Sequence, residues 1–183
     1  MTTGTITDGA VRDATDADAG AVVRIYNPFI TGTVVTFEEV PIDAVEMRRR
    51  MADVRDASLP WLVIEEMGQV AGYAYATRWR VRRAYRYAVE ITIYLAPGHE
   101  GRGLGTRLYG ALFDRLRAAG IHAVIGGIAL PNAASVALHE KMGLRKVAHF
   151  EQVGFKFGRW IDVGYWETLL AGGPDGPVDK EQA

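Results

Sequence analysis

The sequence predicts a mixed α/β (α+β) protein in which helices cover a central sheet. Strand-like and helix-like segments alternate through the middle of the chain, and two adjacent strands typical of a hairpin come before them. That hairpin argues against a doubly wound parallel sheet. With 183 residues, of which 49% are hydrophobic and 23% charged, the chain can form one packed core.

One domain is expected over residues 11–170, because no linker, repeat or low-complexity stretch interrupts it. Residues 1–10 and 171–183 are rich in Gly, Pro, Thr and Asp, and segments of that composition bury little surface. We therefore expect both ends of the chain to be flexible.

The first half contains two helical and two strand-like patterns. Thr15 and Asp18 form a helix-capping pair, and apolar residues then recur at helical spacing as far as Pro28, near which the helix should end. A turn at Met67-Gly68 joins two apolar segments, the second of which alternates tyrosine with alanine as in a pleated strand. The expected elements are helices over about 18–29 and 43–55 and strands over 61–65 and 70–77.

The second half alternates strands with helices. Leucines recur every four residues from Leu104 to Leu116, which indicates a helix that Gly120 ends. Gly143 should end a second helix in the same way. The expected elements are strands over 89–95, 123–128 and 163–170 and helices over 104–119 and 133–142.

Charge and composition exclude several classes of protein. Acidic residues number 22 and basic residues 21, so a formal charge of -1 gives no long-range field for nucleic-acid phosphates. The absence of cysteine excludes disulfides, thiolate metal sites and a cysteine nucleophile, and no metal site is expected. No signal peptide is apparent, and no segment approaches the ~18 apolar residues of a membrane helix. We expect a cytoplasmic protein that binds neither nucleic acid nor membrane.

A glycine-rich segment joins the strand expected over 89–95 to the following helix. Glycines let a backbone approach a ligand closely, and free N–H groups at the start of a helix bind phosphate oxygens. A plain turn has the same composition, and neither a nucleoside-triphosphate loop nor a dinucleotide fingerprint matches the spacing. The candidate ligands of a phosphate group are Gly101, Arg102, Gly103, Leu104, Gly105 and Thr106.

Three features in order resemble the GNAT superfamily of N-acetyltransferases. They are the strand Ile91-Thr92-Ile93-Tyr94-Leu95, then Gly103-Leu104-Gly105 at the start of a helix, then Asn132 before a second helix. The resemblance implies the GNAT fold, a central mixed and mostly antiparallel sheet flanked by helices, with acetyl-CoA as co-substrate. It also implies that the glycine loop holds the pyrophosphate of acetyl-CoA.

The same resemblance implies roles for further residues. Ile93, Tyr94 and Leu95 would pair with the pantetheine arm. Asn132 would contact that arm as well as cap its helix, and Lys141 would face the cofactor unless it is simply solvated. The chain departs from the family at Glu100, where Gln or Arg is usual, and this carboxylate should slightly weaken the local positive potential.

Further motifs narrow the resemblance to the phosphinothricin and methionine sulfoximine or sulfone acetyltransferases, from about Val11 to Leu169. This resemblance implies direct acetylation of the α-amine of a small glutamate- or methionine-like amino acid, a role in detoxification and herbicide resistance, and a homodimer. The motifs are Pro60 to Val63, Gly72 to Ala76, Trp79 to Tyr85, Val89-Glu90, Pro131-Asn132, Leu138 to Glu140 and Gly154 to Gly164.

Glu90 and His139 are the candidate catalytic residues. A carboxylate in an apolar strand needs a partner or a task, so Glu90 either pairs with a nearby arginine or holds and deprotonates the substrate ammonium. His139 follows Asn132 on one helix and is either an ordinary polar residue or a proton-transfer group. The sequence does not decide whether it accepts the amine proton or returns one to sulfur.

A cluster of five arginines is the candidate site for the acceptor's anionic groups. It consists of Arg78, Arg80, Arg82, Arg83 and Arg86. Planar guanidinium groups bind carboxylates and phosphinates better than lysine does, and Arg82, with Arg80 as its companion, is the best candidate by resemblance. Phe37 would wall the pocket from the first loop unless it belongs to the core. The expected substrate-binding residues are Phe37, Arg80, Val81, Arg82, Glu90, Ile91 and Thr92.

Two other functions remain open from the sequence. The enzyme could acetylate a polyamine, an aminoglycoside or a protein N-terminus, although paired arginines should repel polycations. The chain could also be a non-catalytic acetyl-CoA-binding module, which we would expect to have lost Glu90 or His139.

Overall fold

The structure, a computed structural model, describes residues 9–170 and contains one seven-stranded sheet. Residues 1–8 and 171–183, which fall in the segments expected to be flexible, lie outside the described residues. Ala10, the last residue of the first such segment, already pairs with Glu65 in the sheet. The strands are β1 (Ala10–Asp13), β2 (Trp61–Glu66), β3 (Gln69–Arg78), β4 (Ala88–Leu95), β5 (Ala123–Leu130), β6 (Arg145–Lys156) and β7 (Arg159–Leu169).

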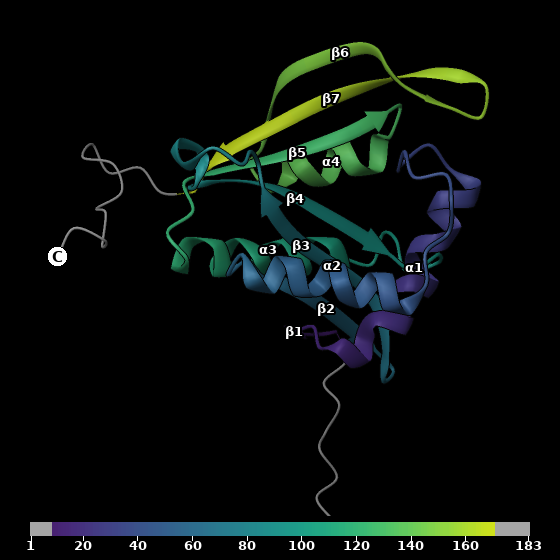
Figure 1. The fold of residues 1–183 in the computed structure, drawn as a ribbon, viewed down its shortest axis with the longest axis vertical. Coiled ribbons are helices and arrows are strands. Elements are labelled where there is room, and N and C mark those ends of the chain that lie inside the picture. The colour runs from purple at the N-terminus through teal and green to yellow at the C-terminus, as the bar shows by residue number, and fades with distance from the viewer. Residues whose placement is uncertain (1–8, 171–183) are drawn as a thin grey trace, which may run out of the picture.

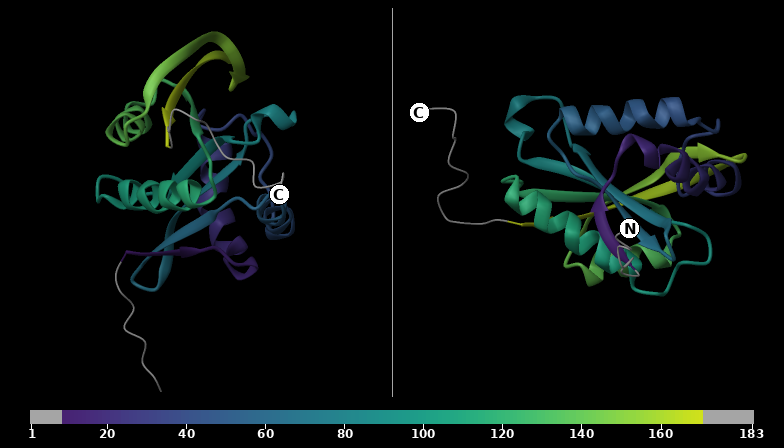
Figure 2. Two further views of the ribbon diagram at one scale, coloured as in Figure 1. Left: turned by 90° about the vertical axis from the view of Figure 1, so that its left-hand side faces the viewer. Right: turned by 90° about the horizontal axis from the view of Figure 1, so that it is seen from below.

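The strand order is β1-β2-β3-β4-β5-β7-β6, and only the β4–β5 pair is parallel (Figure 1). The predicted mixed, mostly antiparallel sheet is therefore confirmed. Helices lie on both faces, with α1 and α2 on one and α3 and α4 on the other (Figure 2). The helices are α1 (Ala19–Gly32), α2 (Ala44–Asp56), α3 (Leu104–Ala118) and α4 (Ala133–Lys141), with 3-10 turns η1 (Asp16–Asp18) and η2 (Arg83–Tyr85).

Each face of the sheet packs its own hydrophobic core. Val89 and Ile91 of β4 lie in the core beneath α3, whereas Tyr94 packs with the core beneath α1 and α2. Because side chains alternate along a strand, Glu90 and Thr92 share the face of Tyr94. The alternation thus puts the one carboxylate of β4 on the α1–α2 face.

Three elements differ from the sequence prediction, and one of them is the short edge strand β1, which was not predicted. Helix α1 continues through Pro28 to Gly32, because Pro28 lies on the exposed side while Ile30 is fully buried and ties the last turn to the core. The edge strand β6 was not predicted. Its register shifts twice against β7, once between Phe150 and Gly154, so its side chains do not keep the alternation that identifies a strand.

Among residues 9–170, no helix is long and apolar enough to cross a membrane.

Candidate active site

The parallel strands β4 and β5 separate after a short stretch of pairing. Their register runs from Ala88 opposite Ala123 to Glu90 opposite Ile125, and both strands continue beyond that point. Within the described residues, the β5-facing backbone of Ile91–Leu95 therefore has no strand partner. This opening, which we call the fork, offers backbone N–H and C=O groups to an extended ligand.

Side chains next to the fork are already packed, so β4 presents its backbone there. Tyr94 contacts the rings of Tyr26, Phe29 and Tyr73. Ile93 and Leu95 pack against the core beneath α3. An extended ligand in the fork would meet the main chain of these residues, as the sequence predicts for Ile93, Tyr94 and Leu95.

The glycine loop leads from β4 into α3 and has an open surface. Gly101 and Gly103 have φ values of +72° and +81°, and a Cβ built on either meets no atom within 4 Å. These glycines are therefore required by backbone conformation, and the space above them is free for a ligand. The N–H groups of Leu104, Gly105 and Thr106 lie in the first turn of α3, where no helical carbonyl reaches them.

Gly105 has a different reason to be glycine. A Cβ there would lie 3.0 Å from a methyl group of Leu138 on α4. The small residue thus lets α3 approach α4 closely, while its N–H group stays at the helix start. Arg102 forms an ion pair with Glu66 at 2.9 Å, so its guanidinium is anchored at the side of the loop.

Glu90 lies at the closed end of the fork, against the backbone of Gly127. A Cβ built on Gly127 would be 2.9 Å from Glu90 Oε1 and 3.1 Å from the ring of Tyr165. Burial raises the pKa of Glu90 above its ordinary value of 4.5, and the positive charge of Arg80 counteracts part of that rise. The carboxylate is thus held in a partly dry position where its basicity is increased.

Arg80 is the arginine of the cluster that the structure associates with Glu90. Its guanidinium stacks on Trp79 at 4.4 Å, and its charge lowers the pKa values of both Glu90 and Tyr165. Arg82 is exposed in the turn before η2, where its carbonyl accepts from Tyr85 N. Val81 between them is 98% exposed, so its side chain borders no closed pocket in this structure.

His139 lies on the other face of β5, buried against Gly126. A Cβ on Gly126 would fall 2.5 Å from the imidazole ring. The His139 Nδ1–H group donates to the Ser135 carbonyl at 2.8 Å, so Nε2 accepts from the Tyr109 hydroxyl at 3.2 Å. Burial lowers the pKa of His139 below 6.5, which keeps the ring neutral near pH 7.

The other predicted residues of α4 lie at its two ends. Asn132 caps the helix, and its Oδ1 accepts from Ser135 N at 3.1 Å. Lys141 is exposed at the last position of the helix.

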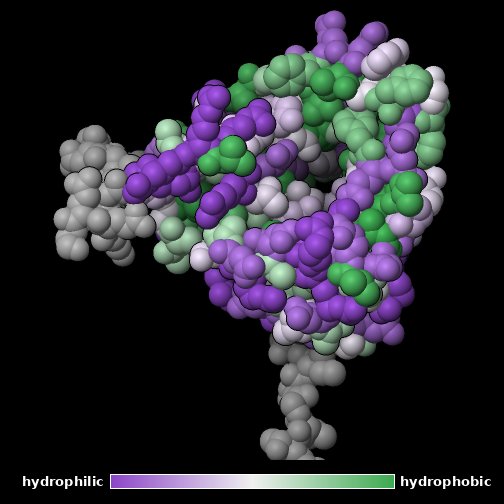
Figure 3. Space-filling model, viewed as in Figure 1, coloured by the Kyte–Doolittle hydropathy of each residue, from purple (hydrophilic) through white to green (hydrophobic). Residues whose placement is uncertain are grey.

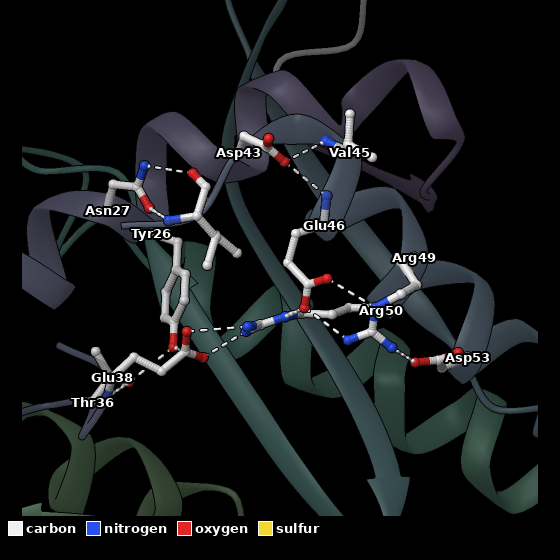
Figure 4. A network of polar contacts seen from close by, with 11 residues as sticks. Tyr26, Asn27, Thr36, Glu38, Asp43, Val45, Glu46, Arg49, Arg50 and Asp53 are labelled. Carbon is white, nitrogen blue, oxygen red and sulfur yellow. Dashed lines mark hydrogen bonds and ion pairs between the residues drawn. The ribbon is translucent and has the colours of Figure 1, made fainter. Parts of the chain in front are cut away.

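The loop between α1 and α2 borders the Glu90 face and is fixed from both sides. The Tyr26 hydroxyl contacts Thr36 and Glu38, and Arg50 of α2 binds the same Glu38 carboxylate (Figure 4). From the β6 side, the buried Lys156 donates to the Thr36 carbonyl at 2.7 Å. The loop is therefore a rigid wall.

Phe37 extends from this wall across to β6. Its ring covers Gly154, where a Cβ would come within 2.2 Å of it, and the side chain remains 41% exposed. That Phe37 walls the acceptor pocket stays a prediction. Thr92 lies on the same sheet face and hydrogen-bonds the Tyr75 side chain, whereas Ile91 points into the opposite core.

A hollow opens on the α1–α2 face between α2 and the strands β5 and β7 (Figure 3). On the same face, a cavity of about 340 Å³ lies between α2 and the β2–β3 pair, with Tyr75 and Thr77 in its wall. Thr77 pairs with Glu90 in the sheet, but Glu90 itself does not line this cavity. No group of three or more His, Asp or Glu side chains within residues 9–170 could hold a metal ion.

Residues 22–144 match the model of the acetyltransferase (GNAT) family. The chain belongs to the GNAT acetyltransferase family. The resemblance seen in the sequence is thereby confirmed, and so is the fold that it implied.

Several similar proteins are named for the acetylation of phosphinothricin, methionine sulfoximine or methionine sulfone. This acetyltransferase is 41% identical to a phosphinothricin N-acetyltransferase of Alcaligenes faecalis, over 89% of this chain and 83% of that protein. It is 38% identical to an L-methionine sulfoximine/L-methionine sulfone acetyltransferase of Salmonella typhimurium, over 87% of this chain and 94% of that one. A crystal structure of a phosphinothricin acetyltransferase from Sinorhizobium meliloti, in complex with AcCoA, superimposes with a TM-score of 0.90 and 35% identity, and the match covers 95% of each chain. Another is named differently: a solved structure of a ribosomal-protein-alanine N-acetyltransferase from Brucella melitensis superimposes with a TM-score of 0.85 and 34% identity, over 87% of this chain and 99% of that one.

Tyr165 is a residue of this acetyltransferase's site that the sequence analysis missed. It lies beside Glu90 over Gly127 and contacts the rings of Trp79 and Phe150 edge-on. It belongs to β7, which is far from β4 in sequence. Nothing in the sequence around an aromatic residue of a C-terminal strand indicates that its side chain will lie in the site.

Proposed function

We propose that this acetyltransferase transfers the acetyl group of acetyl-CoA directly to the α-amine of a small glutamate- or methionine-like amino acid. Phosphinothricin, methionine sulfoximine and methionine sulfone are the acceptors we propose. The observation that carries the proposal is that the Glu90 carboxylate lies against Gly127 at the closed end of the fork, and the positive charge of Arg80 acts on it. That arrangement offers one anion to an ammonium group and one cation to a carboxylate.

The glycine loop and the fork fit the two halves of coenzyme A. The diphosphate would lie over Gly101 and Gly103, where the open space and the N–H groups of α3 accommodate phosphate oxygens. The pantetheine arm would follow the unpaired backbone of β4 toward Glu90. Acetyl-CoA supplies the acetyl group as a thioester.

On the acceptor side, Glu90 would bind the ammonium and remove one proton, so that the free amine faces the carbonyl carbon. Its raised pKa makes the carboxylate a stronger base than an exposed glutamate. Arg80, held flat on Trp79, would bind the α-carboxylate or the phosphinate with two parallel hydrogen bonds. Phe37, Val81, Arg82 and Thr92 remain further proposed contacts of the acceptor, and Ile91, whose side chain lies in the opposite core, would contribute its backbone.

His139 is proposed to act on the side of the departing sulfur. Its ring borders the fork through Gly126, on the face opposite Glu90. The neutral ring accepts a hydrogen bond at Nε2, so the proton that it returns to the thiolate would be the second proton of the amine, lost as the C–N bond forms and the C–S bond breaks. We assign removal of the first proton, from the ammonium group, to Glu90.

We also propose a homodimer formed through the β6–β7 hairpin. β6 is an edge strand, and this hairpin exposes seven large apolar side chains, as interaction surfaces do. They are Val147, Phe150, Val153, Phe155, Phe157, Trp160 and Leu169. Sedimentation of Trp160→Glu against the unchanged protein tests this, and an unaltered monomer in both would remove the proposal.

The cellular role we propose is detoxification in the cytoplasm, including resistance to a herbicide of the phosphinothricin type. Acetylation removes the positive charge of the α-amine, so an analogue no longer offers the ammonium group of the amino acid it imitates. This change in charge is what supports the proposed role. Expression in a sensitive host grown on phosphinothricin tests it.

The activity is tested by release of free thiol from acetyl-CoA against a panel of amines. The panel contains phosphinothricin, methionine sulfone, methionine sulfoximine, spermidine, kanamycin and a peptide with a free N-terminus. We expect turnover with the first three and loss of that turnover in Glu90→Gln. Turnover confined to the polyamine, the aminoglycoside or the peptide would replace the proposed acceptor, and binding without turnover would indicate a non-catalytic module.

A further inference from the structure

Glu66 is a buried carboxylate that contacts the glycine loop from outside the site described above. It is the last residue of β2 and is only 7% exposed. Its Oε2 accepts from His99 Nδ1 at 2.7 Å and lies 2.9 Å from Arg102 Nη1. A single oxygen of one strand thus holds two points of the segment between β4 and α3.

Beyond its first residue, where Ala96 N donates to the Ala71 carbonyl of β3 at 2.8 Å, that segment has little else to tie it to the sheet. Gly98, Gly101 and Gly103 all have positive φ values, and a Cβ built on any of them would meet open space. Glycine loses more conformational freedom on ordering than any other residue, so an unanchored loop of this kind would be costly to order around a ligand. The neighbouring hydrogen bond from Gly98 N to Glu100 lies within the loop and does not tie it to the sheet.

We propose that Glu66 is a positioning residue for coenzyme A, which it serves by holding His99 and Arg102 so that the loop presents its N–H groups to the diphosphate. The inference rests on the proposed function, because it assumes that this loop binds a diphosphate. Under this proposal Arg102 has two roles. It binds the diphosphate itself, and through its ion pair with Glu66 it helps to hold the loop in place.

If Glu66 acted only through its charge, removal of the carboxylate would change the affinity for coenzyme A in the opposite direction. The Glu66 carboxylate partly neutralises Arg102, so its removal would raise the positive potential near the diphosphate and tighten binding. If Glu66 acts by positioning, its removal loosens the loop and weakens binding. The direction of the change in affinity therefore separates the two roles.

The test is Glu66→Gln, which keeps the size of the side chain and removes its charge. Titration calorimetry of coenzyme A into the free protein should show a dissociation constant raised about fivefold. The KM for acetyl-CoA should rise in parallel, while the KM for the amino acid stays within twofold. Affinity for coenzyme A that is unchanged or tighter would overturn the proposal.

Glu65→Gln is the matched control. Glu65 is the adjacent carboxylate and is also ion-paired, but its partner is Arg12 on β1, at 2.6 Å. We expect it to change thermal stability without changing affinity for coenzyme A. A loss of affinity equal to that of Glu66→Gln would show a general effect of weakening β2 and would also overturn the proposal.

His99→Asn removes the same anchor from the loop side and serves if Glu66→Gln folds poorly. In a protein that already carries Arg102→Gln, Glu66→Gln should raise the dissociation constant for coenzyme A by less than it does alone, because the two side chains share one contact. Full additivity would contradict the shared role. Wild-type protein that binds no coenzyme A at all would contradict the proposed function instead, so the two failures are distinguishable.

Discussion

Glu90 and His139 lie on opposite faces of β5, the first against Gly127 and the second against Gly126. Neighbouring residues of a strand point to opposite sides, so the two candidate catalytic groups are separated by the thickness of one backbone. Neither can take over the position of the other. The acceptor and the leaving sulfur are therefore expected to meet separate proton-transfer groups.

Glu90→Gln keeps the shape of the side chain and removes its charge. We expect turnover to fall by ~10²-fold near neutral pH, with partial recovery at high pH as free amine becomes available. Because the pKa of Glu90 is raised by burial, the acid limb of kcat/KM in the wild type should lie above pH 4.5. Steady-state rates from pH 5 to 10 check both points, and unchanged turnover at neutral pH would remove Glu90 from catalysis.

Arg80→Lys tests the proposed carboxylate or phosphinate contact. Lysine keeps the charge but loses the two parallel hydrogen bonds, so the KM for the amino acid should rise roughly tenfold, equivalent to about 1.4 kcal/mol. The resemblance favours Arg82 over Arg80, whereas in the structure the positive charge of Arg80 lowers the pKa of Glu90. Arg82→Lys is therefore the matched comparison in the same assay. If only the Arg82 variant loses affinity, the sequence-based choice was the better one.

Gly103→Val and Gly105→Val should fail for different reasons. Valine at 103 is strained at a φ of +81° and enters the space above the loop, so the KM for acetyl-CoA should rise far more than that for the amine. Valine at 105 would press on Leu138, so thermal stability should fall as well. Melting curves with and without coenzyme A distinguish the two. Equal effects of Gly103→Val on both substrates would count against a phosphate site.

Asp18→Asn tests an ion pair far from the fork. Two guanidinium nitrogens of Arg12 bind the Asp18 carboxylate at 2.7 Å each and lower its pKa from 3.8 to about 2. A carboxylate with a lowered pKa stabilises the fold above pH 3.8, and that contribution disappears as the pH falls toward 2. We expect the variant to lose about 2 kcal/mol at pH 7 and much less near pH 2. Urea unfolding at several pH values measures this, and a loss independent of pH would exclude the charge as its cause.

The sequence predicted those parts of the site that lie in one local segment. The glycine loop, Glu90 and Asn132 carry their own signals of glycine spacing, a carboxylate in an apolar strand and a helix cap. Tyr165 and Glu66 do not, because their importance comes from strands that meet only in the folded sheet. Glu66 in particular follows Glu65 and resembles the solvated end of a strand.

The order of strands was likewise beyond local patterns. β7 inserts between β5 and β6, and that crossing brings Tyr165 to Glu90. The expected helix end at Pro28 failed for a related reason, since burial of Ile30 outweighs the local preference of proline. Periodicity identifies elements, whereas tertiary packing decides where they end and which of them meet.

The two glycines of β5 have a consequence for the tolerance of this strand to mutation. Alanine at 126 would strike the imidazole, and alanine at 127 would strike the carboxylate, so each position is restricted from a different side. Glycine weakens a strand by its flexibility, and here Tyr165 of β7 lies opposite Gly127 and its ring covers that glycine, whereas the ring of Trp166 lies over Gly164 of β7 itself. A saturation library selected for activity should therefore retain glycine at both positions. Tyr165 should accept only other large rings, so that it varies together with Gly127.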